Sequence, residues 1–388
     1  MDYSNLNKLV QQAPENLIRT FSDEIANIED LLFFNIGEPD FATPEVVKEA
    51  AKASIDADQS FYTHSRGLVE LREAIRNYLQ RKYDLTYRVE DQIIVTSGAT
   101  EALYLALMGI TNPGEEVVVV EPNYVIYNTH IALTGAIPVS IDVSTTQFKL
   151  TPEQLDTTLT NHPNTKALIF NHPTNPTGVT YTGEEIEALS KIIKKHNLYV
   201  ISDEVYSEFT YTHHHVSMAQ FIPERTLLVN GTSKSHAMTG WRSAFLTGPA
   251  ELLDVIYPLH QAVITAPTTQ VQYASIVAYN EADDAIVSMY ESYRKRRDFI
   301  YNGLNELGFD SLYPDAAFYL FTKVPDWFDG DDYEFCLVLA QQAKIAVTPG
   351  QIFGAAGRGY FRTSYVSSLD NLAEYLKRIE NFRKSYTN

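Results

Sequence analysis

The sequence contains a single cysteine, Cys336, among its 388 residues. An internal disulfide is therefore impossible, which fits a reducing compartment and excludes a disulfide-stapled secreted scaffold. No apolar run approaches the roughly 20 residues that span a bilayer, and the longest candidates are Leu31 to Phe34 and Val117 to Val120. The polar N-terminus also lacks the apolar segment of a signal peptide. We therefore expect a cytoplasmic protein without a membrane partner.

Positive charge is also scarce, because 49 Asp and Glu residues outnumber 30 Lys and Arg residues and give a formal charge of −19. Nucleic-acid binders need clustered positive charge to displace counterions from phosphates. The acidic balance therefore argues against a nucleic-acid partner. Glycine and proline number only 18 and 17, and 45% of the residues are hydrophobic. This composition predicts a packed globular protein without broad disorder.

Alternating patterns between about residues 45 and 285 indicate an α/β fold. Short β-branched runs alternate there with helical patterns such as Glu101–Ile110 and Glu184–His196, as expected for a mostly parallel sheet. In such open sheets, ligands bind beyond the carboxyl ends of the strands. The predicted strands are Ile93–Thr96, Val117–Val120, Ile137–Ile141, Ala167–Phe170, Tyr199–Ser202, Thr226–Asn230 and Ser243–Gly248.

The pattern changes near Asp283, where a second, smaller α+β unit is expected to begin. We therefore predict an N-terminal segment (1–45) that packs with the small domain, a large domain (46–284) and a small domain (285–388). The basic run Arg294–Arg297 is interpreted as a solvent-exposed helix face, because the chain is acidic overall. The elements expected in this unit are a long helix from Asp283, alternating segments near Phe318–Thr322 and Ile345–Val347, and a final helix from about Leu369.

Two segments that follow predicted strands can be interpreted either as structural turns and caps or as parts of a ligand-binding site. Small residues in Ser97–Leu103 lead directly into a helix, whose free N–H groups and positive end bind phosphates. An ordinary capped helix explains the same residues equally well. Turn-forming residues fill Asn171–Gly178, which is either a tight connection with a cis proline bond or a rigid mount that aims Asn175 into the cleft.

The next two predicted strands lead to ionisable residues. Asp203 at the end of a buried strand needs a cationic or proton-donating partner, such as a protonated pyridine nitrogen, unless it forms a structural salt bridge. Tyr206 follows three residues later and can present a phenol to the same space. Lys234 follows the sixth strand, and Arg242 lies eight positions further on. A partly desolvated lysine suits covalent chemistry and an arginine suits an anion, so this spacing is the most specific signal in the chain.

Taken together, these segments resemble the motifs of the class I/II aminotransferases, pyridoxal-phosphate enzymes of fold type I. The similarity extends from Asn35–Pro39 to Gly359–Arg362, nearly the whole chain, and the motifs occur in family order. The segment Gly231–Arg242 is most similar to the bacterial branch that contains aromatic, aspartate and N-acetyl-diaminopimelate aminotransferases. The resemblance implies a large domain with a seven-stranded, mostly parallel sheet between helices. The motifs that carry it are Asn175–Gly178, Asp203–Tyr206, Ser233-Lys234 and Thr239–Arg242.

The resemblance also implies a role for each matching residue. Lys234 would bind pyridoxal phosphate covalently and act as the general base, while Asp203 would pair with the protonated ring nitrogen. Tyr206 would hydrogen-bond the ring 3-oxygen, and Tyr124 would stack on the ring face. The other implied contacts are Asn175 to the 3-oxygen; Ala99, Thr100, Ser233 and Arg242 to the phosphate; Arg362, assisted by Gly37 and Asn175, to the substrate carboxylate; and Tyr62 from the second subunit of a homodimer.

The implied activity moves an amino group between an L-amino acid of the aromatic, aspartate or diaminopimelate type and a 2-oxo acid such as 2-oxoglutarate, by a ping-pong mechanism. A C–S β-lyase of the same fold is the alternative, because it uses the same lysine and aspartate. A regulator built on this fold would carry an N-terminal DNA-binding module, and only 36 residues precede Gly37. A catalytically dead scaffold should have lost Lys234 or Asp203, and both are present.

Four positions depart from the family pattern without removing a group essential to the chemistry. Ser243-Ala244 stands where an aliphatic residue and glycine are usual, and Ala316 stands where glycine is common. Gly231 stands where a phosphate-binding serine is frequent, so the phosphate contacts expected from this turn depend on Ser233.

Several other residues give weaker signals. Adjacent residues point in different directions, so we do not expect His213–His215 to bind a metal. His236 lies close to Lys234 in sequence, but a packing role is expected for it. Phe21, Tyr127 and Tyr319 could line a pocket, which faintly favours a substrate with an aromatic side chain.

Overall fold

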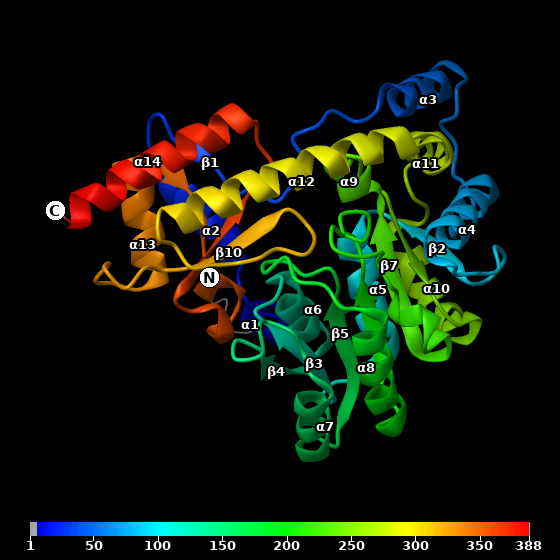
Figure 1. The fold of residues 1–388 in the computed structure, drawn as a ribbon. Helices are drawn as coiled ribbons and strands as arrows, with labels where there is room; N and C mark the ends of the chain where they lie inside the picture. The colour runs from blue at the N-terminus through cyan, green and yellow to red at the C-terminus, as the bar shows by residue number, and fades with distance from the viewer. Residues whose placement is uncertain (1–5, 388) are drawn as a thin grey trace.

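The computed structural model, which describes residues 6–387, has two lobes joined by the long helix α12 (Asp283–Glu306), as Figure 1 shows. The large lobe is built on a seven-stranded sheet and the small lobe on a four-stranded sheet. Helix α12 packs against α11 (Thr269–Glu281) of the large lobe and α14 (Leu369–Thr387) of the small lobe. This one helix therefore contributes to both lobes.

The seven-stranded sheet confirms the predicted α/β fold. Its strand order is β2-β8-β7-β6-β5-β3-β4, and only β8 runs antiparallel to its neighbours. Each of the seven strands overlaps one of the predicted segments. Their bounds are β2 (Ile93–Thr96), β3 (Glu116–Glu121), β4 (Ile137–Asp142), β5 (Thr165–Asn171), β6 (Tyr199–Asp203), β7 (Thr226–Gly231) and β8 (Ala244–Thr247).

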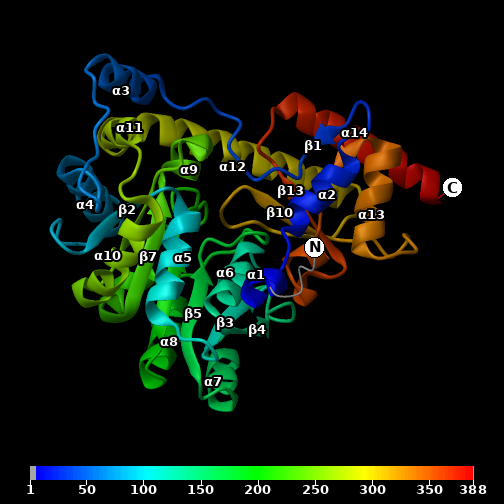
Figure 2. The same cartoon turned by 180° about the vertical axis from the view of Figure 1, so that it is seen from behind.

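Both faces of the sheet are buried at its centre, where successive side chains of a strand enter hydrophobic clusters on opposite sides. Val117 and Val119 of β3 pack with one cluster, whereas Val118 packs with the other. Figures 1 and 2 show α5 on one side of the sheet and α8 on the other. The helices of the first side are α5 (Ala99–Ile110), α6 (Ile126–Thr134) and α10 (Ala250–Ile264); those of the second are α4 (Val69–Tyr83), α7 (Pro152–Asn161), α8 (Gly183–Lys195) and α11.

Local sequence signals set the ends of the covering helices. Thr182 caps α8 through a reciprocal hydrogen-bond pair with Glu185, in which each side chain accepts from the other residue's backbone N–H. Acidic residues occupy the first turn of α8, and Lys194 and Lys195 occupy the last, so the charges complement the helix dipole. The strong α8 pattern explains why the sequence places this helix within one residue of its observed bounds.

The small lobe combines the C-terminal part of the chain with residues near the N-terminus. Its antiparallel sheet has the order β12-β13-β10-β9, while β1 pairs in parallel with β11 and so ties the N-terminal segment to this lobe. Cys336 is fully buried in the core of this lobe, on α13. The remaining elements are α1 (Lys8–Gln12), α2 (Leu17–Ile25), β1 (Leu32–Phe33), α3 (Glu45–Asp56), β9 (Ser311–Leu312), β10 (Tyr319–Lys323), α13 (Asp332–Val338), β11 (Ile345–Ala346), β12 (Thr348–Pro349) and β13 (Tyr360–Ser364).

The expectation of a fully solvated basic face on α12 is wrong for two of its residues. Arg296 is buried and forms an ion pair with Asp40 at 2.7 Å, while buried Arg297 pairs with Asp298 and lies over the Tyr211 ring. Long side chains on α12 reach neighbouring segments that are distant in sequence. Within residues 6–387, no helix combines the length and apolarity needed to cross a membrane.

Candidate active site

Polar residues from several strands meet at the carboxyl edge of the large sheet. Strands β5, β6 and β7 are parallel neighbours, and Asn171 at the end of β5 pairs in register with Asp203 at the end of β6. Lys234 lies on the short helix α9 (Thr232–Ser235), directly after β7. The topology thus gathers the motifs that follow the strands, as predicted for an open α/β sheet.

Lys234 is held in a partly desolvated position beside the N-terminal segment. Its Nζ donates a hydrogen bond of 2.6 Å to the carbonyl oxygen of Gly37. Burial lowers the pKa of Lys234 to about 8, with nearby Glu38 opposing that shift. The amine therefore gives up its proton at a lower pH than an exposed lysine does. A Cβ at position 37 would displace the Tyr319 hydroxyl, so glycine fits best there.

Asp203 is a buried carboxylate without a cationic partner among the described residues. Tyr127 donates a hydrogen bond of 2.7 Å to Asp203 Oδ2, and the Val205 N–H approaches Oδ1 at 3.4 Å. No lysine, arginine or histidine of residues 6–387 forms an ion pair with it. Burial raises the pKa of Asp203 to about 6, although the Tyr127 hydrogen bond lowers it. Such a carboxylate is suited to receive a cation from a ligand.

Replacing Tyr127 with phenylalanine is expected to destabilise the cofactor-free chain at pH 8. The substitution removes a hydrogen bond to a buried carboxylate, which costs about 1–3 kcal/mol of unfolding free energy. It should also raise the pKa of Asp203 further, because the Tyr127 hydroxyl stabilises the ionised form. Urea unfolding measures the first effect. Tyr104→Phe on α5 is the matched control, and equal losses from both variants would contradict the assigned hydrogen bond.

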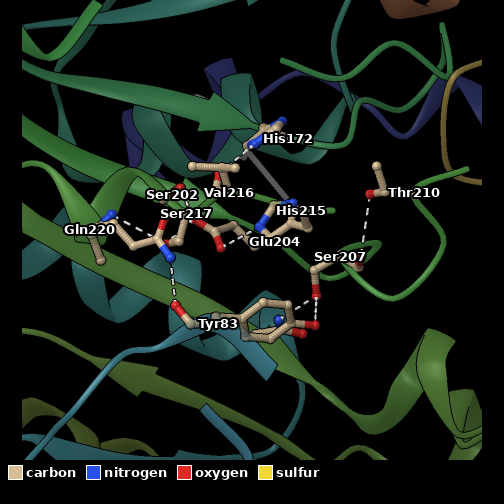
Figure 3. A network of polar contacts seen from close by, with 12 residues as sticks. Tyr83, His172, Ser202, Glu204, Ser207, Thr210, His215, Val216, Ser217 and Gln220 are labelled. Atoms are coloured by element: carbon tan, nitrogen blue, oxygen red, sulfur yellow. Dashed lines mark hydrogen bonds and ion pairs between the residues drawn. The ribbon is translucent and has the colours of Figure 1, made fainter. Parts of the chain in front are cut away.

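A second buried carboxylate, Glu204, lies directly after Asp203 and has abundant partners, as Figure 3 shows. Glu204 accepts hydrogen bonds from Ser202 and Ser217 at 2.7 and 2.8 Å. His215 Nε2 completes the set at 2.8 Å from Glu204 Oε2. The two adjacent acids therefore differ in surroundings, because Glu204 is satisfied within the protein and Asp203 is not.

His172 connects this network to the backbone that carries Asp203. Its ring lies 4.6 Å from the His215 ring and donates through Nε2 to the Val216 carbonyl at 2.9 Å (Figure 3). The His172 backbone N–H donates to the Asp203 carbonyl at 3.0 Å. The buried polar network thus fixes the end of β6.

Arg362 on β13 is a fully buried cation that has no carboxylate partner among residues 6–387. Its guanidinium donates to Asn175 Oδ1 and to the Asn35 carbonyl, both at 2.8 Å. It lies between the rings of Tyr319 and Phe353, at 4.5 and 4.9 Å. Its buried Nε has no hydrogen-bond partner within the part of the chain that the structure describes. An uncompensated guanidinium of this kind is suited to a carboxylate ligand.

A second group of residues suited to an anion lies where α5 begins. The backbone N–H groups of Ala99 and Thr100 lie in the first turn, where they have no intrahelical partners. Exposed Arg242 reaches Gly98. Glycine suits this position because its φ is +88° and because any Cβ added there would collide with the Arg242 guanidinium. Half-buried Ser233 lies next to Lys234. This arrangement fits a phosphate group.

The three remaining predicted residues are tyrosines that differ in burial. The Tyr206 ring centre lies 5.9 Å from Lys234 Nζ, and the Tyr206 hydroxyl is 2.7 Å from the Tyr319 hydroxyl. Tyr124 contacts Tyr127 edge to face at 5.8 Å. Tyr62 is instead 87% exposed, so the single subunit does not enclose it.

The histidines singled out from the sequence have structural partners. His236 is fully buried, donates through Nε2 to the Ala278 carbonyl at 3.0 Å, and contacts the Tyr279 ring, as the packing interpretation expects. His215 points inward to Glu204, whereas His214 is exposed and His213 contacts the His214 carbonyl. The three adjacent histidines therefore do point in different directions.

These groups define a site for an anionic ligand with a cationic ring and a reactive carbonyl, next to a carboxylate substrate. The α5 start suits the phosphate, unpaired Asp203 suits a protonated ring nitrogen, and the Lys234 amine suits the carbonyl. Buried Arg362 remains free for the substrate. The residues present therefore fit pyridoxal phosphate and an amino or oxo acid.

The comparisons with known proteins agree with this class of site. A family model described as aminotransferase class I and II matches residues 29–379, so the chain belongs to that family. A Bacillus subtilis protein named probable N-acetyl-LL-diaminopimelate aminotransferase is 40% identical over 97% of this chain and 95% of its own length. The aspartate aminotransferase of Bacillus subtilis is 36% identical over 92% of each chain.

Solved structures give the same result. The Pyrococcus horikoshii aromatic aminotransferase is 35% identical, has a TM-score of 0.89, and is matched over 94% of this chain and 99% of its own. The Thermus thermophilus aspartate aminotransferase with maleate is 34% identical, with a TM-score of 0.92 and coverage of 97% and 99%. The protein is therefore a pyridoxal-phosphate-dependent aminotransferase, and nothing in the comparisons supports the C–S lyase alternative.

Proposed function

We propose that the enzyme transfers an amino group between an L-amino acid and a 2-oxo acid through the residues described above. The observation that carries this proposal is the buried, unpaired guanidinium of Arg362, which is joined to Asn175 in the same site as Lys234. A carboxylate bound there bidentately would place the substrate's α-carbon within reach of the lysine. Gly37, whose carbonyl accepts from Lys234, would assist at the substrate.

Each polar residue of the site is then assigned at least one task. When bound, pyridoxal phosphate supplies an electron-withdrawing ring linked covalently to the substrate nitrogen. Asp203 would hold the positive charge of the ring nitrogen, and Lys234 Nζ would take the proton from the substrate α-carbon and deliver it to the cofactor carbon. Tyr206 and Asn175 bind the ring 3-oxygen, while Tyr124 covers the ring face. The phosphate contacts come from Ala99, Thr100, Ser233 and Arg242.

A second copy of the chain completes the site in this proposal. Tyr62 is 87% exposed and its neighbour Phe61 is 80% exposed, which leaves two aromatic side chains available to another subunit. Aromatic residues exposed in this way are typical of interfaces. We infer a homodimer in which Tyr62 of each subunit contacts the cofactor of the other, and we place the enzyme in the cytoplasm.

The amino donor is proposed to come from the classes named in the relatives, which are aspartate, aromatic amino acids and N-acetyl-LL-diaminopimelate. All of them share the α-carboxylate that Arg362 would bind. A panel of these donors with 2-oxoglutarate, followed through the conversion of the cofactor absorption, tests this. Turnover of tyramine, which lacks the carboxylate, as fast as L-tyrosine would contradict the assignment.

Replacing Arg362 with lysine is expected to lower kcat/KM about 100-fold for every active donor, because an ammonium cannot replace the bidentate guanidinium. The affinity for pyridoxal phosphate should change little, since Arg362 does not lie at the proposed phosphate site. Steady-state kinetics and a cofactor titration measure the two effects separately. If Arg362→Lys instead binds pyridoxal phosphate weakly but has unchanged kcat/KM when the cofactor is saturating, Arg362 binds the cofactor and not the substrate.

A further inference from the structure

His260 on α10 is fully buried and bridges two segments of the proposed site. Its Nδ1 lies 2.8 Å from Glu101 Oε1, and its Nε2 lies 2.7 Å from the carbonyl oxygen of Ser65. Glu101 belongs to the first turn of α5, where the phosphate is proposed to bind. Ser65 lies in the connection between α3 and α4 that carries Tyr62.

The partners of His260 determine how many protons the pair holds. A carbonyl oxygen only accepts, so Nε2 must carry a hydrogen to bond Ser65. A neutral ring would then direct the Nδ1 lone pair at a carboxylate oxygen only 2.8 Å away. One further proton must therefore lie between His260 and Glu101. Whichever atom holds that proton, the pair has no net charge.

The neutrality of the pair matters because Glu101 fixes a turn beside the proposed phosphate site. Its Oε2 accepts a hydrogen bond of 2.5 Å from the Ser97 N–H, in the turn that leads through Gly98 to the start of α5. An isolated carboxylate in that position would fix the turn but repel a phosphate dianion. Paired with His260, it can fix the turn without adding negative charge.

We propose that His260 is a positioning residue for cofactor binding. It supplies the proton that keeps Glu101 from repelling the cofactor phosphate, and its second hydrogen bond fixes the Ser65 segment to the same turn. Two parts of the site that are about 35 residues apart in sequence are thereby joined through one imidazole. This inference rests on the proposed phosphate contacts of Ala99 and Thr100.

The test compares pyridoxal phosphate with pyridoxal, which lacks the phosphate, as ligands of the full-length chain after cofactor removal. In His260→Asn, an amide can still donate to Glu101 but supplies no additional proton. We expect about tenfold weaker binding of pyridoxal phosphate, with the affinity for pyridoxal unchanged. In the double variant His260→Asn/Glu101→Gln, affinity should return to within about threefold of the wild type, because the unpaired charge is gone.

His162→Asn is the matched control, since His162 also pairs with a carboxylate, Glu116, at 3.0 Å but away from the site. It should change neither affinity. Unchanged phosphate-dependent affinity in His260→Asn, equal losses for both ligands, or no recovery in the double variant would each overturn the proposal. If His260→Asn does not fold, Glu101→Gln tests the proposal instead. Nearly unchanged affinity for pyridoxal phosphate in Glu101→Gln would support it. A tenfold loss of that affinity would overturn it, because the site would then need the carboxylate charge.

The wild-type chain separates this inference from the function on which it rests. Tighter binding of pyridoxal phosphate than of pyridoxal is required by the proposed phosphate contacts. A wild-type chain that binds both ligands equally would refute those contacts, whereas a wild-type preference that persists in His260→Asn would refute only the role of His260.

Discussion

Lys234→Ala is expected to abolish transamination, with kcat reduced by about 10⁴-fold or more. Lys234 is assigned both the covalent attachment of the cofactor and the transfer of the α-proton. Its position supports both roles, because burial lowers its pKa to about 8 and so keeps the amine available near neutral pH. Steady-state assays and the absorption of the bound cofactor measure the two losses. Borohydride reduction and peptide mapping should place the cofactor on Lys234 in the wild type alone.

Lys166→Ala provides the control for a lysine of the same sheet. Lys166 lies near the start of β5, 5.6 Å from the Tyr199 ring, and carries no proposed catalytic task. It should retain wild-type turnover. Normal turnover in Lys234→Ala, or cofactor attached to another lysine after reduction, would refute the assignment.

Asp203→Asn is expected to lower kcat by about 10³-fold and to stabilise the cofactor-free chain at the same time. The activity falls because a neutral amide cannot hold the charge of the ring nitrogen. The stability rises because the substituted amide can still accept the hydrogen bond from Tyr127 without burying a charge. Raising the pKa of Asp203 from 3.8 to about 6 corresponds to about 3 kcal/mol.

The pH dependence of this stability difference follows from the direction of that shift. The folded chain keeps the Asp203 proton to a higher pH than the unfolded chain does. Below about pH 4 the carboxyl is protonated in both states, so its burial does not lower the unfolding free energy. The unfolding free energy then falls as the pH rises through about 6 and stays lowered above it. Urea unfolding should therefore show equal stability of the wild type and Asp203→Asn at pH 4, and a more stable variant at pH 8. A less stable variant at pH 8 would contradict the unpaired carboxylate.

The large sheet could be predicted from the sequence because each strand is short, apolar and followed by a recognisable turn or helix start. Both faces of the sheet are covered at its centre, so β3 and β5 are apolar along most of their length. The small lobe is harder to predict from the sequence, because its two-residue strands β1 and β11 pair although they are about 300 residues apart. No local pattern encodes such a pairing.

The site was predictable where residues follow strands and not where they lie on covering helices. Asp203 ends β6 and Lys234 lies just after β7, and the order of the motifs indicates their proposed roles. The sequence identifies Tyr127 only as a pocket residue, although it lies in the first turn of α6, three residues after Tyr124. His260 carried no signal, since its partners come from two other segments. The burial of Arg296 likewise depends on Asp40, which is distant in sequence.

The single thiol of the chain, Cys336, can report when the small lobe opens. The side chain is fully buried, and burial raises the pKa of the thiol well above its usual range, so a maleimide has no access to a thiolate in the folded lobe. Alkylation must therefore wait for that lobe to open. Because one site per chain can react, the labelling rate with and without a substrate analogue reads out how strongly ligand binding holds this lobe closed.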